Sequence, residues 1–79
     1  MEYQEFLTWL ENERAMGNRS ARDVVSRLRR VVNLLGEEVI DEASVEKLNV
    51  NSAFDDFSMY IKSQLRRSVK LYMEYSAQK

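Results

Sequence analysis

The sequence predicts an all-α fold, a compact bundle of four or five helices, and three observations lead to this prediction. Apolar residues recur at spacings of three and four along most of the chain, which is the period of a helix that buries one side. No stretch alternates between apolar and polar residues for long enough to form a strand. The chain also contains no Pro that would interrupt a helix.

The first predicted helix runs from Glu2 to Met16, and Gly17 and Asn18 end it. Its apolar side consists of Tyr3, Phe6, Leu7 and Leu10. Trp9 lies beside this apolar line and is therefore either an edge of the core or part of a contact surface. An amphipathic ring in a small domain usually covers core, so we expect the first of these.

The segment from Ser20 to Gly36 carries a start signal, a stop signal and two opposed faces. Ser20 is a suitable N-cap, Asp23 places a carboxylate where the helix dipole favours one, and Gly36 suits a left-handed residue after the last turn. The side predicted to be buried contains Val24, Val25, Leu28, Val31, Val32 and Leu35. The other side contains Arg22, Ser26, Arg29, Arg30 and Asn33, which can meet phosphate oxygens or water.

The acidic stretch that follows predicts one short helix. Asp41 or Ser44 can cap it, and it would end at Leu48 with Val45 and Leu48 pointing inward. The carboxylates here belong to Glu37, Glu38, Asp41, Glu42 and Glu46. They lack the alternating spacing and the central Gly of a calcium loop, so we expect a solvated acidic connection and no metal site.

The last predicted helical stretch is capped by Asn51 or Ser52 and reaches Ala77, and a break near Ser63 would divide it into two helices. Its apolar face contains Phe54, Phe57, Ile61, Leu65, Val69, Tyr72 and Tyr75. Three bases at positions 62, 66 and 70 recur every four residues and stack into a stripe, with Arg67 beside it. These like charges repel one another, so water and salt, an acidic neighbouring helix or a nucleic-acid backbone must offset them.

Length and composition limit the possible functions. The 79 residues form a single domain, residues 1–79, and the absence of Cys and His excludes disulfides and thiolate or imidazole metal sites. No apolar run approaches the roughly 20 residues of a membrane span. The N-terminus is acidic and amphipathic, unlike a secretory signal, so we expect a cytoplasmic location and no membrane partner.

An enzymatic function is not expected. Without His or Cys the usual general base and the thiol nucleophile are missing, and there is no Gly-rich phosphate loop. The near-adjacent acids Glu11 and Glu13, or Asp55 and Asp56, diverge around a helix axis and do not form a convergent pair. We therefore predict no catalytic residues and no cofactor.

The net charge of −1 conceals alternating blocks of opposite sign. Residues 1–13 carry four acids and no base, whereas residues 14–35 carry six Arg and one Asp. Residues 36–61 carry seven acids and one Lys, and residues 62–79 carry five bases and one Glu. Two basic helices can thus form a local positive face on an acidic protein, although oppositely charged helices can equally lie beside each other.

Two segments resemble a known domain. FLTWLENERAMGNRSARDVVSRLRRVVNLLG has an aromatic-led helix, a short break and a Ser-capped helix with alternating aliphatic residues and Arg, and LRRSVKLYMEYS combines aliphatic, basic and aromatic positions. Together they resemble the SAM-like core-binding domain of phage integrases and other tyrosine recombinases. The resemblance covers most of the chain and implies a bundle of four or five helices that clasps duplex DNA by phosphate contacts.

The resemblance implies a set of DNA-binding positions, namely Arg19, Arg22, Arg29, Lys62, Arg66, Arg67 and Lys70. This chain departs from the family because the separate catalytic domain with its tyrosine nucleophile is absent and because its charge is less basic. Tyr72 and Tyr75 therefore inherit no catalytic role and are expected to be core aromatics.

Two functions follow from these observations. The first is a non-catalytic DNA-binding helical module, supported by the pair of basic helix faces and the family-like segments. The alternative is a protein-interaction or self-associating helical bundle in which segregated charges pair across an interface. An exposed patch containing Trp9, Met59, Leu71 or Met73 would favour this alternative.

Overall fold

The computed structural model describes residues 3–36 and 40–78 and contains five helices within them. They are α1 (Tyr3–Glu13), α2 (Asn18–Leu35), α3 (Ser44–Asn49), α4 (Ser52–Asp55) and α5 (Met59–Ala77). The described residues include no strand, so the predicted all-α fold is confirmed. Three residues named in the sequence predictions, Glu2, Glu37 and Glu38, lie outside the described part of the chain.

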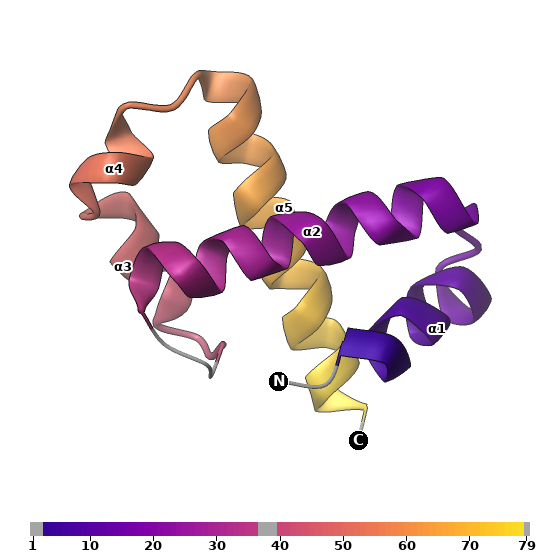
Figure 1. Cartoon of the computed structure of the whole chain (residues 1–79). Helices are drawn as coiled ribbons and strands as arrows, with labels where there is room; N and C mark the ends of the chain where they lie inside the picture. The colour runs from indigo at the N-terminus through magenta and orange to yellow at the C-terminus, as the bar shows by residue number, and fades with distance from the viewer. Residues whose placement is uncertain (1–2, 37–39, 79) are drawn as a thin grey trace.

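The two long helices, α2 and α5, cross at the centre of the molecule and the three shorter helices pack at its two ends (Figure 1). At one end α1 contacts both long helices, and at the other end α3 also contacts both. The short helix α4 follows α3 and leads into the first turn of α5. The result is a slab with principal extents of 35, 23 and 15 Å.

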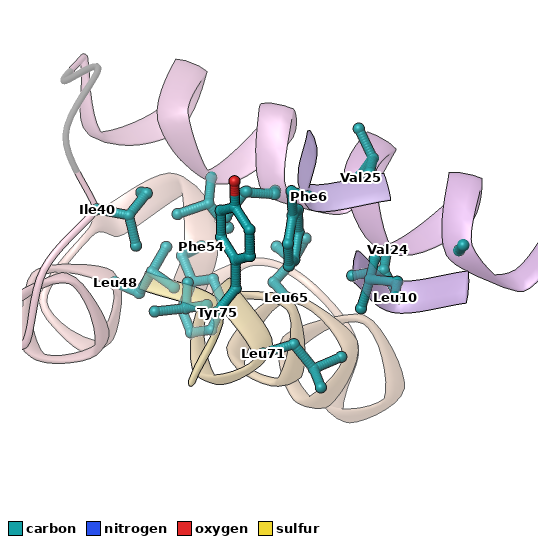
Figure 2. Close-up of a cluster of buried hydrophobic side chains, with 14 residues drawn as sticks. Phe6, Leu10, Val24, Val25, Ile40, Leu48, Phe54, Leu65, Leu71 and Tyr75 are labelled. Carbon is teal, nitrogen blue, oxygen red and sulfur yellow. The ribbon is translucent and has the colours of Figure 1, made fainter. Parts of the chain in front are cut away.

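One hydrophobic core joins all five helices (Figure 2). Its fully buried side chains include Phe6, Leu10, Leu28, Val31, Leu48, Phe54, Leu65 and Val69. The predicted buried side of α2 is confirmed in its central part, where Val24, Val25, Leu28 and Val31 are buried, while Val32 and Leu35 are half-buried.

An aromatic cluster fixes α1 on α5. The ring of Phe6 meets that of Tyr72 edge-on, with centroids 5.2 Å apart, and lies 5.4 Å from that of Tyr75. Trp9 is half-buried against the same cluster, and its Nε1–H donates a hydrogen bond of 3.0 Å to Oε1 of Gln78. The predictions that Trp9 lies at the edge of the core and that both tyrosines are core aromatics are confirmed.

The start of α2 differs from the prediction and its end agrees with it. The helix begins at Asn18 after the N-cap residue Gly17, whose carbonyl accepts a hydrogen bond from the amide of Ala21 at 3.0 Å. Helical bonding is therefore established before Ser20, so the prediction of Ser20 as N-cap is wrong. Gly36 has a φ of 67° and its amide donates to the carbonyl of Val32 at 2.9 Å, which confirms the predicted C-terminal cap.

We expect Gly36→Ala to lower the free energy of unfolding by about 1–2 kcal/mol, because a Cβ disfavours a positive φ. No other atom crowds this position, so the loss comes from the backbone conformation. Gly17→Ala is the matched control because Gly17 has a φ of −64° and equally open surroundings. There the lower entropy of the unfolded chain offsets the poorer N-cap residue. Urea unfolding followed by circular dichroism tests both variants, and an equal loss in both would contradict this account.

The boundaries of the other helices also depart from the predictions. The first helix ends at Glu13 rather than Met16, and Ala15 adopts a φ of 52° in the connection that follows. Ser44 is the first residue of α3 rather than its cap, since the N-cap is Ala43. The hydroxyl of Ser44 instead accepts a hydrogen bond from the amide of Asp41, and a carboxylate oxygen of Asp41 accepts one from the amide of Ala43.

The break in the last helical stretch lies before Ser63. Asn51 caps α4, as predicted, by accepting a hydrogen bond from the amide of Phe54 at 3.0 Å. The chain then turns at residues 56–58, and the hydroxyl of Ser58 caps α5 by accepting from the amide of Ile61. Ser63 lies inside α5, so the prediction of a break there is wrong.

Candidate nucleic-acid interface

The outward face of α2 is basic and entirely polar. We define it by the exposed residues of this helix, which are Asn18, Arg19, Ser20, Arg22, Asp23, Ser26, Arg29, Arg30 and Asn33. Four guanidinium groups thus stand against one carboxylate, and the remaining side chains are amides and hydroxyls. Every residue of this face except Asp23 can donate a hydrogen bond from its side chain.

The helix presents this face because its opposite side is buried. The apolar residues of α2 recur at helical spacing and pack against α1, α3 and α5, which turns the intervening polar residues to solvent. Arg27 lies on one flank and is half-buried. The sequence prediction of two opposed faces for this helix is confirmed.

The four exposed arginines fall into two pairs along α2. Near its C-terminal end, Cζ of Arg29 lies 4.8 Å from the ring centroid of Tyr3, and Cζ of Arg30 lies 4.8 Å from that of Phe57. Near its N-terminal end, Arg19 and Arg22 make no ion pair, hydrogen bond or ring contact with the described part of the chain. Both line a shallow hollow together with Asn18, Asp23 and Ser26.

Two of the predicted basic residues of α5 are held by the neighbouring helices. Nε and Nη2 of Arg66 donate hydrogen bonds of 3.2 and 2.8 Å to Oδ1 of Asn49 in α3. Nζ of Lys62 lies 3.5 Å from a carboxylate oxygen of Asp55 in α4. Both cations also lie over the buried ring of Phe54, at 5.2 Å for Arg66 and 5.9 Å for Lys62. The stripe is therefore offset in part by contacts within the protein.

The other two predicted bases of α5, Arg67 and Lys70, are exposed and lie away from α2. On a helix of 3.6 residues per turn they project from the side opposite to the buried residues Leu65 and Val69. Since α2 and α5 pack on each other through their buried sides, their outward faces point in opposite directions. The structure thus brings Arg19, Arg22 and Arg29 onto one face and leaves the bases of α5 elsewhere.

The sequence prediction omitted Arg30 from the DNA-binding positions. This residue follows Arg29 directly and belongs to the same outward face, so the helical period of the sequence contained the signal. Its contact with Phe57 could not be foreseen, because that ring comes from the turn between α4 and α5.

Large apolar side chains are exposed at the opposite end of the molecule from α1. Val50, Met59 and Tyr60 are exposed by 85%, 75% and 65%, respectively. The predicted patch is otherwise not formed, since Leu71 is buried and Trp9 and Met73 are half-buried against the core. Met59 is thus the one exposed member of the four residues that the sequence singled out.

Searches for other kinds of site give negative results within the described ranges 3–36 and 40–78. No three carboxylates there lie in a group that could hold a metal ion. None of the five helices combines the length and apolar character needed to cross a membrane.

Comparisons of this chain with models of known protein families, with curated proteins and with solved structures give no significant match. The functional interpretation therefore depends on the charge, exposure and geometry of the side chains described above.

Proposed function

We propose that this chain is a non-catalytic helical module that binds the phosphate backbone of duplex DNA through the outward face of α2. The observation that carries the proposal is the surplus of four exposed arginines over one aspartate on a single 18-residue helix. The segments that resemble core-binding domains of tyrosine recombinases point to the same ligand.

The chemistry of this face suits phosphate better than a protein partner. Arginine forms paired, charge-assisted hydrogen bonds with phosphate oxygens, and serine and asparagine side chains also donate to them. Stable protein interfaces depend on buried aromatic and aliphatic side chains, of which the outward face of α2 has none. Phosphate contacts of this kind position a protein on DNA without reading its sequence.

The proposal assigns different roles to the predicted basic residues. Arg19, Arg22 and Arg29, joined by Arg30, are the phosphate-binding residues. Lys62 and Arg66 have their charges engaged by α3 and α4, and they act in the packing of those helices. Arg67 and Lys70 face another direction and add only to the long-range field of the protein.

Binding through four arginines predicts a definite salt dependence. Neutralising four phosphates gives a slope of about −3.6 for the logarithm of the affinity against the logarithm of the salt concentration. Affinity should therefore fall about a hundredfold between about 50 and 200 mM salt. The acidic remainder of the chain opposes binding, so we expect moderate affinity even at low salt.

The double variant Arg22→Glu/Arg29→Glu tests this proposal. We expect it to weaken binding by about a hundredfold or more, because both substitutions place carboxylates against phosphates. Fluorescence anisotropy of a labelled duplex, titrated with protein at two salt concentrations, measures the effect.

The control for that experiment is Arg67→Glu/Lys70→Glu, which changes the net charge equally on the other side of the molecule. We expect this variant to weaken binding by about threefold or less at physiological salt, where charges more than roughly 10 Å away are screened. Equal losses in both variants would contradict the assignment to α2. Absence of salt-dependent binding by the unaltered protein would contradict the function itself.

A second candidate function, a protein-interaction or self-associating bundle, is favoured by the exposure of Val50, Met59 and Tyr60. We propose it as the alternative to DNA binding. Light scattering of the protein alone over a wide concentration range tests self-association. A mass that stays monomeric throughout would contradict that form of the alternative.

A further inference from the structure

We propose that Arg29 and Arg30 form a preordered phosphate-binding pair that supplies most of the affinity for duplex DNA. This inference rests on the proposed function and goes beyond it by ranking the four arginines of the outward face. Its basis is the contrast between two arginines that lie on aromatic rings and two that do not.

The two members of the pair are held by different parts of the fold. Consecutive residues on an α-helix are turned by about 100° from each other, so Arg29 and Arg30 lean towards opposite flanks of α2. On one flank Tyr3 belongs to α1, and on the other Phe57 belongs to the turn that precedes α5. Two separate elements therefore support the pair from both sides of the helix.

Stacking fixes a guanidinium group while leaving its hydrogen-bond donors available. The group lies with its flat face over the ring, and its N–H donors point outward in its own plane. Neither guanidinium donates a hydrogen bond to a described residue of the chain, and both side chains are exposed. Two charged donor groups thus stand in set positions on the surface, ready for two phosphate groups.

The other two arginines lack such support. Arg19 and Arg22 have no ring beneath them in the described part of the structure, so their long side chains keep their rotamer freedom in the free protein. That freedom is lost when a phosphate fixes them, which reduces what each contact adds to the affinity. Equal charge on the two pairs therefore does not mean equal contribution.

Lysine substitution separates charge from stacking. Lys keeps the positive charge but loses the flat group and its fixed fork of donors. We expect Arg29→Lys/Arg30→Lys to weaken duplex binding by about tenfold, whereas Arg19→Lys/Arg22→Lys weakens it by about two- to threefold. The salt slope should stay the same in both, because the number of charges does not change.

Anisotropy titrations of the two double variants with the same labelled duplex measure this contrast, and circular dichroism verifies the helical content of each. Equal losses, or a larger loss for Arg19→Lys/Arg22→Lys, would overturn the inference while leaving the proposed function in place. No binding by the unaltered protein would overturn the function and the inference together.

A second measurement needs no DNA. Relaxation of the side-chain ¹⁵Nε nuclei in the free protein reports how far each arginine is ordered. We expect high order for Arg29 and Arg30 and low order for Arg19 and Arg22. Similar order in all four would contradict the preordering even if their binding effects differed.

Discussion

Phe6→Ala is expected to lower the free energy of unfolding by about 3–5 kcal/mol, the usual loss for a large buried aromatic residue. A domain of this length has a total stability of about 4–12 kcal/mol, so this loss leaves a substantial unfolded population. Phe6 is fully buried and its ring contacts those of Tyr72 and Tyr75. Its removal opens a cavity between α1 and α5 that the stiff rings around it cannot fill.

The control for this prediction is Tyr60→Ala, an equally large truncation at a residue that is 65% exposed. We expect its effect to stay within about 0.5 kcal/mol. Urea titrations followed both by circular dichroism and by the fluorescence of Trp9 measure the two variants. Similar losses for Phe6→Ala and Tyr60→Ala would contradict the assignment of Phe6 to the core.

Arg66→Glu is expected to lower the free energy of unfolding by about 2 kcal/mol. The substitution removes two charge-assisted hydrogen bonds to Oδ1 of Asn49 and the cation over the ring of Phe54. It also places a carboxylate near the Asn49 oxygen and over the negative face of the ring. We expect α3 and α4 to loosen from α5 as a result.

Arg67→Glu is the matched control, because it makes the same charge change one residue away on an exposed part of α5. Its effect should remain within about 0.5 kcal/mol. Thermal unfolding measures the global effect, and amide hydrogen exchange locates it. Faster exchange in α3 and α4 of Arg66→Glu but not of Arg67→Glu is the expected result, and equal behaviour of the two would contradict it.

These variants also affect how DNA-binding experiments are interpreted. Lost binding after charge reversal at Arg66 would reflect the displacement of α3 and α4 as much as a lost phosphate contact. Charge reversal at Arg22 and Arg29 avoids this problem, because both side chains are exposed on the outward face of α2.

Local signals in the sequence were sufficient where the deciding interaction lies within one helix. The C-terminal end of α2 was predictable because Gly36 itself takes the positive φ that ends the helix. The buried side of α2 was predictable because helical spacing alone determines which side chains share a face. The basic outward face follows from the same periodicity.

Predictions failed where partners distant in the sequence decide the outcome. α2 begins at Asn18, whose side-chain amide donates to a carboxylate oxygen of Glu11 in α1 at 3.1 Å. The N-terminal end of α5 was misplaced because the hydroxyls of Ser58 and Ser63 are equally capable caps in the sequence, and only the turn at residues 56–58 selects the first. Likewise, no local pattern reveals that Asn49 accepts hydrogen bonds from Arg66, 17 residues later.

The contacts between α1 and the end of α5 make the described chain almost a closed ring. The Tyr75 hydroxyl donates to Glu5, Trp9 donates to Gln78, and Arg14 pairs with Glu74, so residues 60 to 70 positions apart meet along one seam. The two ends consequently emerge close together (Figure 1). A short peptide could join them and new ends could be opened at residues 56–58, so the order in which the helices are connected is separable from the way they pack.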